Sequence, residues 1–281
     1  MLFGEYRVEV VPDAEFWLDG GAMFGVVPRT LWGRVAPPDE LNRVRLNANC
    51  LFVDTGRERV LVETGMGDKW DARRAETYGL RRERTLAESL PALAGCRAED
   101  VTVVVNTHLH FDHAGGNTTN DDEGRAVPAF PNARYLVSRD ELDHAERPHE
   151  RDRASYLPEN WRPLAESGQL ELVPPDYEAV PGLRLETVPG HSRTMQCVRL
   201  ERGGRTLYGF ADLVPTRAHV PLAWVMGYDL FPVETVEQKR RLLPLAAREN
   251  WLCLFYHDPE APLCRLVEDS GRLRAEPAGS A

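Results

Sequence analysis

The chain has 281 residues, enough for one large α/β domain or two small ones with a sizeable hydrophobic core. Its formal net charge of −10 argues against a nucleic-acid partner, because such binding depends on Lys and Arg side chains that neutralise phosphates. No apolar run approaches the ~20 residues of a membrane span, and the first residues show no signal peptide. Five cysteines without a Cys-x-x-Cys pair favour buried thiols in a reducing compartment, which predicts a cytoplasmic protein.

The N-terminal part of the chain contains two unlike patterns. Residues 6–11 alternate weakly between apolar and polar side chains and predict an edge strand. Residues 14–47 interleave aromatic side chains with Gly and Pro and follow neither a helical nor a strand period. This segment either packs irregularly against the core or forms a lid whose aromatic side chains line a substrate pocket. Phe24 and Trp32 are the candidate pocket residues within it.

A hairpin and a helix are expected next. Residues 49–54 and 59–63 predict two strands joined by a tight turn. A helix is expected over residues 84–94, where leucines recur at helical spacing and Gly95 follows as a stop signal.

The strongest chemical signal follows the β-branched run 101–105, which predicts a buried strand. The next stretch reads Thr-His-Leu-His-Phe-Asp-His-Ala-Gly-Gly-Asn. Alternate residues of an extended chain face the same side, so His108 and His110 can reach one point. Asp112 and His113 come after the chain turns and can face a second point nearby. Because imidazole and carboxylate suit zinc and similar ions, the stretch predicts a two-metal site, whose ions usually lie about 3.5–4 Å apart.

The second half of the chain predicts further strands, a second insertion and a long helix. Ser138 and Glu141 have the spacing of a capping box that opens a helix. Residues 148–163 contain several prolines and are a second lid candidate. The remaining predicted elements are strands at 170–173, 183–188, 196–200 and 206–210, a helix at 234–250 with a kink or break at Pro244, and a terminal strand or short helix within 262–276.

The pattern His-x-His-x-Asp-His after an apolar strand resembles the metallo-β-lactamase superfamily of binuclear metallohydrolases. That family's further ligands, a His in a Gly-His turn, an Asp after a strand and a late His, have matches at His191, Asp212 and His257. The resemblance covers nearly the whole chain. It implies an α/β fold, a metallo-β-lactamase-like αβ/βα sandwich in which two mixed sheets pack face to face with helices outside. The chain is then a single domain over 1–281, with lid segments at 14–47 and 148–163.

The resemblance also assigns the ligands. His108, His110 and His191 would hold one divalent ion, Asp112, His113 and His257 would hold the other, and Asp212 would bridge them. Asp112 and Asp212 are the expected catalytic residues: a hydroxide shared by the ions would attack the substrate, and Asp112 would orient it and pass its proton to the leaving group. Zinc is the expected ion, and manganese, iron and cobalt accept the same ligands.

Within the superfamily, the chain looks most like the branch of N-acyl homoserine lactone lactonases and methyl parathion hydrolase. The segments Asn49-Cys50-Leu51, Gly67-Asp68-Lys69 and Met226-Gly227-Tyr228-Asp229 carry this likeness. It implies hydrolysis of an ester, lactone or phosphotriester bond in a small molecule. The alternative is a mononuclear iron oxidoreductase of the persulfide dioxygenase type on the same fold. A homodimer is a further expectation, from the aromatic segments.

Two positions depart from that branch. Lactonases carry a Tyr three residues after the bridging Asp, where this chain has Pro215. Tyr228, Tyr256 and His219 are the candidates to replace it, and Tyr228 and His219 are also candidate pocket residues. The acid of the family's Asp-Thr-Gly motif is Glu63 here, where it either supports the metal ligands or only ends a strand.

Overall fold

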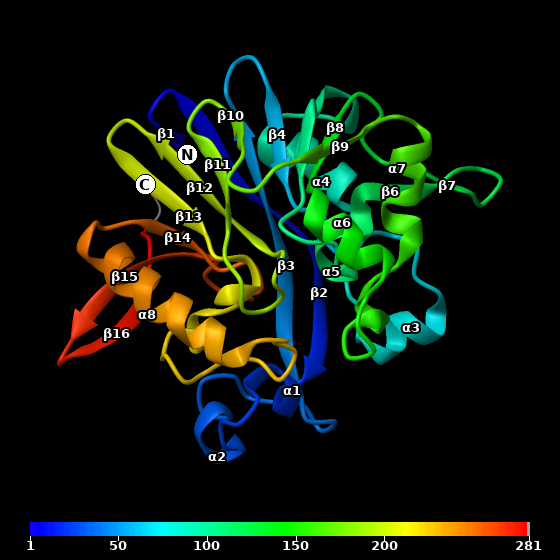
Figure 1. The fold of residues 1–281 in the computed structure, drawn as a ribbon. Coiled ribbons are helices and arrows are strands. Elements are labelled where there is room, and N and C mark those ends of the chain that lie inside the picture. Colours follow the sequence, from blue (N-terminus) through cyan, green and yellow to red (C-terminus); the bar gives the residue numbers. More distant parts are fainter. Residues whose placement is uncertain (280–281) are drawn as a thin grey trace.

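Two seven-stranded sheets lie face to face in the computed structural model, which describes residues 1–279 (Figure 1). In order across the first sheet, the strands are β1 (Leu2–Phe3), β2 (Tyr6–Asp19), β3 (Arg43–Asp54), β4 (Arg59–Val62), β5 (Val103–Val105), β8 (Arg134–Ser138) and β9 (Leu170–Val173). Across the second sheet they are β10 (Glu178–Val180), β11 (Leu183–Thr187), β12 (Gln196–Arg202), β13 (Arg205–Gly209), β14 (Leu252–Leu254), β15 (Leu263–Asp269) and β16 (Arg272–Pro277). A separate small hairpin pairs β6 (Thr118–Asn120) with β7 (Ala126–Pro128). Both large sheets are mixed, because β4, β5, β8 and β9 run parallel in the first and β13 and β14 in the second.

Helices lie outside the two sheets (Figure 1). The α-helices are α1 (Gly20–Phe24), α2 (Arg29–Trp32), α3 (Ala72–Thr77), α4 (Leu86–Ala94), α5 (Phe111–Ala114), α6 (Arg139–Glu146), α7 (Arg162–Glu166) and α8 (Pro232–Arg248). Short 3₁₀ helices are η1 (Ala98–Asp100), η2 (Gly115–Asn117), η3 (Arg153–Ser155), η4 (Pro158–Asn160), η5 (Ala211–Leu213) and η6 (Arg217–His219).

Three apolar layers hold this arrangement together. Successive side chains of a strand face opposite sides, so Val103 and Val105 enter the layer between the sheets while Val104 packs outward. Leu90 of α4 lies in the same outer layer as Val104. On the far side, Leu243 of α8 packs in the layer outside the second sheet. The order helix, sheet, sheet, helix confirms the predicted sandwich.

Several predicted elements are confirmed at close to their expected bounds. The hairpin of β3 and β4 and the strands β9, β11, β12 and β13 are present. Helix α4 ends at Gly95, which adopts a left-handed conformation with φ of 61°.

The segment 14–47 was predicted to be irregular, yet β2 and β3 extend into it from both sides. The pairing of these strands shifts register between Pro12 and Glu15, so the neighbours Asp13 and Ala14 are both buried. This bulge interrupts the alternation of buried and exposed side chains, which hid the strand in the sequence. The irregular part is confined to the connection that carries α1 and α2.

Three other expectations differ from the structure in part. The strand expected at a sheet edge over 6–11 is β2, which pairs with β3 on one side and, through Tyr6 and Arg7 alone, with the two-residue β1 on the other. The break that was one expectation at Pro244 is absent: helix α8 continues through this residue, which lies on the exposed side, where water can bond the freed carbonyl. The terminal strand expected within 262–276 is present as two strands, β15 and β16, which form a hairpin.

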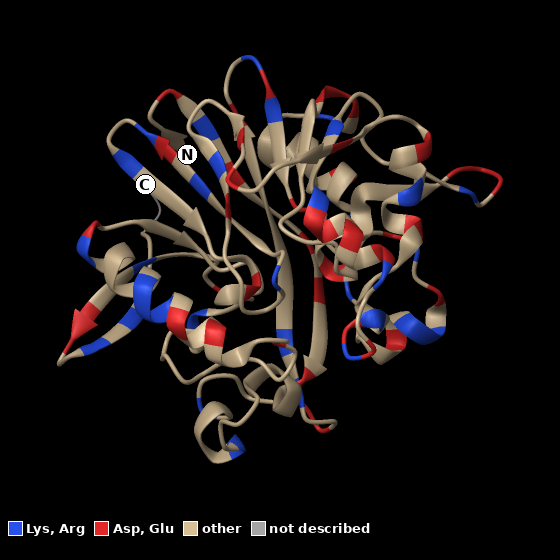
Figure 2. Ribbon diagram, viewed as in Figure 1, with Lys and Arg blue, Asp and Glu red and all other residues tan. Residues whose placement is uncertain are grey.

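Charged side chains of both signs are interspersed over the outer helices and hairpins (Figure 2). Among residues 1–279, no helix combines the length and apolar composition that a membrane crossing needs. The cysteines are all buried and none forms a disulfide, as the sequence led us to expect.

The connection from β13 to α8 is fixed by a buried lysine. Lys239 of α8 is fully buried, and its ammonium group donates hydrogen bonds to the carbonyl oxygens of His219 at 2.6 Å, Pro221 at 2.8 Å and Trp224 at 2.8 Å. A charged group is stable away from water only when its donors are satisfied, and here all three are. This one side chain therefore fixes the conformation of residues 219–224.

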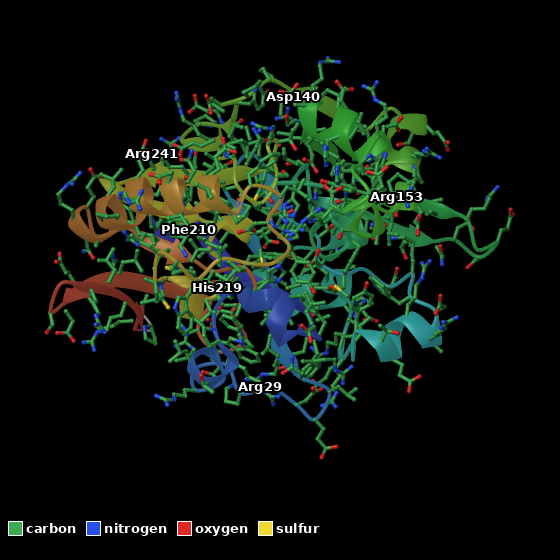
Figure 3. All side chains as sticks on the ribbon, turned by 60° about the horizontal axis from the view of Figure 1, so that its bottom comes forward. Arg29, Asp140, Arg153, Phe210, His219 and Arg241 are labelled. Carbon is green, nitrogen blue, oxygen red and sulfur yellow. The ribbon has the colours of Figure 1, made fainter. Side chains whose placement is uncertain are left out.

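We predict that Lys239→Met lowers the free energy of unfolding by about 1–3 kcal/mol, because three buried carbonyl oxygens lose their donor. Arg241→Met is the matched control, since Arg241 extends from the exposed side of the same helix (Figure 3). Chemical denaturation of both variants measures the effect. Equal changes in the two variants would contradict the role of the lysine.

His219 in the same connection is held as a neutral ring. Its Nε2 donates to the carbonyl oxygen of Met23 at 2.9 Å, and the Thr216 hydroxyl donates to its Nδ1 at 2.8 Å. Burial lowers the pKa of His219 to about 3. Because the folded pKa lies below the ordinary value, the unfolded chain binds one more proton at acid pH, and folding loses stability as pH falls.

We predict that the stability advantage of the wild type over His219→Gln shrinks as pH falls from neutrality toward acid. The decrease should approach about 1.4 kcal/mol per pH unit once pH is below the ordinary histidine pKa of ~6.5. Denaturation of both proteins across this range gives the difference and cancels the contribution of the other histidines. A difference that does not change with pH would show that His219 takes up a proton in the folded state.

Candidate metal centre

Strands of both sheets end at one edge, where the seven predicted ligands come together. Residues 108–113 follow β5 and run into α5, while His191 lies between β11 and β12. Asp212 is in η5, directly after β13, and His257 follows β14. All seven side chains are buried. The structure therefore brings every sequence-predicted ligand to one place.

Three histidines surround a point on one side of Asp212. His110 Nδ1 and His191 Nε2 lie 3.1 Å apart, and His191 Nε2 lies 3.4 Å from Asp212 Oδ2. His108 Nε2 is 4.0 Å from the same oxygen. The donor atoms of these four side chains all lie within 4.8 Å of one another, as a metal site requires.

A second cluster lies on the other side of Asp212. His113 Nε2 and His257 Nε2 are 3.2 Å apart, and Asp112 Oδ2 is 3.6 Å from His257 Nε2. Asp212 Oδ1 lies 3.3 Å from His113 Nε2 and 3.1 Å from His257 Nε2. The two oxygens of one carboxylate therefore face two different clusters.

The spacing of the donor atoms suits bound divalent ions better than direct hydrogen bonds between the side chains. A tetrahedral ion with bonds of ~2.05 Å holds its donors about 3.3 Å apart, close to most of the separations in both clusters. The buried atoms His108 Nε2 and Asp212 Oδ1 have no hydrogen-bond partner anywhere in the described chain. Buried polar atoms without a partner are costly, and a cation in each cluster would satisfy them.

The outward nitrogens of three histidines are hydrogen-bonded to other groups, and that of a fourth lies near a carboxylate. The hydrogen-bonded pairs are His108 Nδ1 with Thr107 Oγ1 at 2.9 Å, His191 Nδ1 with Asp229 Oδ1 at 3.1 Å, and His257 Nδ1 with the carbonyl oxygen of Asn47 at 2.9 Å, while His113 Nδ1 lies 3.3 Å from Glu63 Oε1. Such contacts fix the tautomer and the orientation of a ligand ring. Each ring is thereby prepared to offer its inward nitrogen to a cation.

Glu63 supports the site from behind. Its carboxylate also accepts a hydrogen bond from the backbone N–H of Thr107 at 3.1 Å, so it ties the strand end to the ligand loop. Glu63 itself has φ of 64°, a conformation that non-glycine residues rarely adopt. Because His113 turns its other nitrogen toward Asp212, the position of Glu63 is that of an orienting partner.

Burial sets the charge states of the site. Burial and neighbouring histidines hold the pKa of His108 and of His110 well below the usual value, so both rings are neutral at neutral pH, the form that binds metals. Burial alone would raise the pKa of Asp212, but His257 and His113 more than offset it and hold that pKa well below its usual range. Asp212 is therefore a carboxylate between histidines.

Two glycines let the ligand loop lie directly on its neighbour. A Cβ added at Gly115 would be 2.2 Å from the carbonyl oxygen of Met66, and one at Gly116 would be 2.3 Å from that of Thr64. Any larger residue would push the two segments apart. Lys69 completes the contact, since its ammonium group donates to the carbonyl oxygen of Gly115 at 2.6 Å.

Glu141 supports the loop and does not cap a helix as predicted. The Ser138 side chain makes no capping hydrogen bond to α6, so the predicted capping box is wrong. Glu141 is fully buried and accepts hydrogen bonds from the backbone N–H of Leu109 at 2.7 Å, from the Tyr156 hydroxyl at 3.2 Å and from the Thr194 hydroxyl. It thus joins the ligand loop to the 148–163 segment, because the buried Tyr156 anchors that segment.

A cavity of about 290 Å³ opens onto both clusters. His110, Asp112, His191, Asp212 and His257 reach its surface. Its remaining lining comes from Phe111 of the ligand stretch and from four other segments of the chain, which contribute Leu18, Met23, Tyr78, Arg151, Asp152, Ala154, Ser155, Met226, Gly227 and Tyr228. Residues 151–155 belong to the predicted second lid.

Of the four predicted pocket residues, only Tyr228 lines this cavity. Phe24 and His219 line a neighbouring cavity of about 760 Å³, and their rings stack 4.5 Å apart. Trp32 is buried and stacks on the other side of Phe24 at 5.2 Å, without reaching either cavity.

Sequence reasoning missed several residues of the site. Thr107 begins the His-rich stretch, and Asp229 ends a segment that carries the family resemblance. No spacing rule, however, predicts that they contact His108 and His191. Asn47 acts through its backbone carbonyl, for which the sequence has no signal. Tyr78 and Arg151 reach the cavity from segments far from the ligands in the chain, and only the fold brings them there.

Comparisons with known proteins agree with this geometry. The family model of the metallo-beta-lactamase superfamily matches residues 43–257. An N-acyl homoserine lactonase of Bacillus cereus is 28% identical over 234 residues, which are 78% of this chain and 84% of the relative. The lactonase AttM of Azorhizobium caulinodans is 31% identical over 188 residues, 65% of this chain and 67% of the relative.

Solved structures share the fold. A probable metal-dependent hydrolase from Staphylococcus aureus superposes with a TM-score of 0.90 at 28% identity, over 100% of both chains. AidC, a dizinc quorum-quenching lactonase in complex with a product, has a TM-score of 0.81 at 20% identity, over 100% of this chain and 97% of its own. The ligand pattern, the two mixed sheets and the family match agree: this chain belongs to the metallo-β-lactamase superfamily, with lactonase-like hydrolases among its relatives.

Proposed function

We propose that this protein is a two-metal hydrolase that cleaves an ester, lactone or phosphotriester bond of a small molecule. The observation that carries the proposal is Asp212, whose two oxygens face two separate ligand clusters beside one cavity. The proposed first cluster is His108, His110 and His191, and the second is Asp112, His113 and His257.

Divalent ions in these clusters would lower the pKa of a water between them and polarise the bond to be cleaved. The chain's own residues hold that chemistry in place. Asp212 and the surrounding histidines supply donors with little further reorganisation, because the outward nitrogens of His108, His191 and His257 are already hydrogen-bonded. Asp112 lines the cavity, so its carboxylate can take a proton from the nucleophile and deliver it to the leaving group.

The cavity supports a small substrate. Its volume of about 290 Å³ is near the lower end of ordinary ligand sites, which span about 300–1,000 Å³. Leu18, Phe111 and Met226 make part of its wall apolar. Because curated relatives at 28–31% identity are N-acyl homoserine lactonases, lactones head the proposed substrates, before other esters and phosphotriesters.

The second cluster favours this proposal over a mononuclear iron oxidoreductase. A one-metal enzyme has no need for Asp112, His113 and His257 to converge. Here these side chains are buried, and their donor atoms lie within the distances of a metal site. The donor set of imidazole and carboxylate supports zinc as the proposed ion.

Tyr228 is the proposed replacement for the lactonase tyrosine that is absent at Pro215. Tyr256 is committed elsewhere, because its hydroxyl donates to the carbonyl oxygen of Asp112 at 2.8 Å and its ring stacks on His113. Both ring nitrogens of His219 are also engaged. Tyr228 lines the cavity, and burial raises its pKa to about 12, so its hydroxyl remains a hydrogen-bond donor at neutral pH.

The proposed setting is a reducing compartment, as the buried free thiols suggest. A homodimer is also proposed, and the exposed apolar side chains of Val26, Leu31 and Leu41 around α1 and α2 support it.

The first test is hydrolysis of an aryl ester, a lactone and a phosphotriester before and after metal removal. We expect turnover of at least one substrate, loss of turnover on chelation, and recovery when a divalent ion is restored. Undiminished turnover by the chelated, metal-free protein would contradict a metal-dependent mechanism. Oxygen consumption with a persulfide, with no hydrolysis, would favour the oxidoreductase.

Replacing one ligand of the second cluster should test the two-metal assignment. We predict that His113→Ala lowers kcat by at least about a hundredfold, because an electrostatic contribution to the transition state is lost. Far-ultraviolet circular dichroism should show an intact fold. His149→Ala is the control, since that histidine is 65% exposed. Full turnover in the His113 variant would mean that the second cluster is not needed.

The role of Tyr228 can be tested separately. We predict that Tyr228→Phe lowers kcat by about tenfold to a hundredfold, with little change in KM, if its hydroxyl donates to oxygen that gains charge in the transition state. Tyr78→Phe is the matched control, because Tyr78 lines the same cavity. Equal losses in the two variants, or none in either, would remove Tyr228 from this role.

A further inference from the structure

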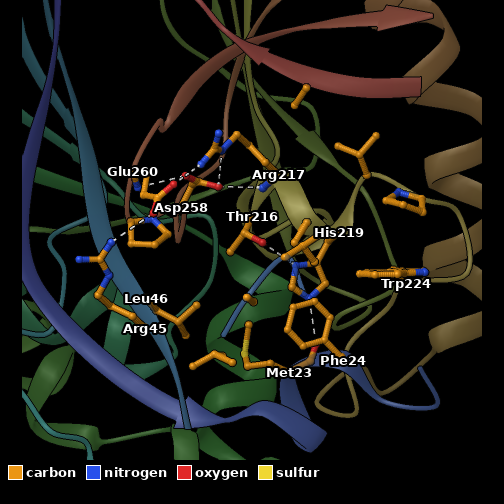
Figure 4. A pocket seen from close by; sticks show the side chains of 18 of the residues that line it. Met23, Phe24, Arg45, Leu46, Thr216, Arg217, His219, Trp224, Asp258 and Glu260 are labelled. Atoms are coloured by element: carbon orange, nitrogen blue, oxygen red, sulfur yellow. Dashed lines mark hydrogen bonds and ion pairs between the residues drawn. The ribbon is translucent and has the colours of Figure 1, made fainter. Parts of the chain in front are cut away.

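A buried carboxylate lies directly beside the ligand His257 and takes no part in the proposed reaction. Asp258 is 3% exposed and follows His257 in the chain. It does not line the cavity at the metal centre but lies in the wall of the neighbouring cavity, with Arg217 against it (Figure 4). Burying a charge is costly, so a buried acid outside the chemistry needs another explanation.

Two segments of the chain use the full hydrogen-bonding capacity of this carboxylate. The backbone N–H groups of Glu260 and Ala261 donate to Asp258 Oδ1 at 3.1 and 2.8 Å. Arg217 donates twice to Asp258 Oδ2, from its backbone N–H and from Nε, each at 3.0 Å. The bonds to Oδ1 shape the local turn, whereas those to Oδ2 come from a segment 41 residues earlier in the chain.

The bonds from Arg217 connect the segments that carry Asp212 and His257. Asp212 lies in η5, and Arg217 begins the next short helix, η6. The backbone N–H of His257 also donates to the carbonyl oxygen of Pro215, at 2.9 Å. Because β13 and β14 end before these segments begin, strand pairing no longer joins them. These contacts therefore fix how His257 lies relative to Asp212.

Such a link is needed because the two ligands do not hold each other. His257 Nε2 lies 3.1 Å from Asp212 Oδ1, yet within residues 1–279 that oxygen makes no hydrogen bond. His257 Nδ1 donates to the carbonyl oxygen of Asn47, so in the neutral ring that binds a metal Nε2 carries a lone pair. Until a cation lies between them, two such acceptor atoms repel each other. The surrounding protein must hold them close.

Asn49 holds the same ligand from the first sheet. Its side-chain amide donates to the carbonyl oxygens of Tyr256 and Asp258, both at 2.9 Å, and these residues flank His257. Asn49 belongs to β3, so it fixes the backbone of His257 relative to the first sheet. Arg217 fixes the same backbone relative to Asp212, which follows a strand of the second sheet.

We propose that Arg217 and Asp258 form a positioning pair that holds His257 and Asp212 at ligand distance and thereby raises the affinity for one of the two ions. This inference rests on the two-metal assignment proposed above. It identifies residues that determine the occupancy of the cluster to which His257 belongs. Neither residue lines the cavity at the metal centre, so the pair acts through His257. A hydrogen bond between two ionised groups is strong and directional, which suits this role.

Three substitutions separate the pair from its surroundings. Asp258→Asn keeps the size of the side chain but replaces one acceptor oxygen by an amide that donates. Arg217→Gln removes the Nε–H donor and the positive charge. Glu260→Gln is the matched control, because Glu260 also lies 3.0 Å from Arg217 but is 66% exposed, where an ion pair contributes little (Figure 4).

Metal binding is the first readout, and it does not depend on knowing the substrate. We expect two zinc ions in the wild type, measured by elemental analysis and by competition with a chelator. Asp258→Asn and Arg217→Gln should each weaken the binding of one ion by about 10–100-fold, as loss of a partner behind a ligand typically does. The other ion should bind as in the wild type, and Glu260→Gln should keep both affinities.

Turnover gives a second readout, with any substrate that the wild type hydrolyses. In Asp258→Asn and Arg217→Gln we expect a lower kcat that excess zinc restores, with KM unchanged, because only the occupancy of one cluster has fallen. The double variant should lose no more affinity than Asp258→Asn alone, since the bonds between the two residues can be lost only once.

The outcomes distinguish this inference from the proposed function. A wild type that binds a single ion would contradict the two-metal proposal and this inference with it. Two ions in the wild type, with unchanged affinities in both variants, would overturn only the positioning role, even if the variants unfold at lower denaturant concentrations. If Asp258→Asn does not fold, Arg217→Gln carries the test, because that side chain is 28% exposed.

Discussion

The site depends on one buried carboxylate shared by two groups of imidazoles. Asp212 stays ionised in the interior because histidines surround it, and the unpartnered atoms that result are the atoms a divalent ion would bind. A buried charge of this kind is costly, so the rest of the fold must hold its neighbours in place. Two sheets deliver them: residues 108–113 come from the first, and His191, Asp212 and His257 come from the second.

Buried charged side chains outside the two clusters hold the candidate ligands in position. Glu63, Glu141 and Asp229 are buried carboxylates that fix the ligand loop or a ligand ring. Lys239 fixes the connection that runs from Asp212 toward Tyr228 and α8. The same connection lines both cavities, so the metal centre and the neighbouring cavity share one scaffold.

Sequence reasoning predicted a set of side chains that the fold does bring together, because their chemistry is concentrated: His108 to His113 follow a clear strand, and the family pattern continues at His191, Asp212 and His257. It failed where tertiary contacts override local pattern. A bulge at Pro12 hid the length of β2, and the buried Glu141 was mistaken for a cap because burial is invisible in the sequence. Of the predicted pocket residues, Tyr228 lines the cavity at the metal centre, Phe24 and His219 line the neighbouring cavity, and Trp32 lines neither, because only the fold separates the two cavities.

The most direct test of the account is a crystal structure of the purified protein, with anomalous diffraction recorded on both sides of the absorption edge of its metal. The account predicts two ions about 3.5–4 Å apart, one on each oxygen of Asp212, with His110 and His191 on one ion and His113 and His257 on the other. A single ion, or ions bound away from Asp212, would contradict the two-metal site.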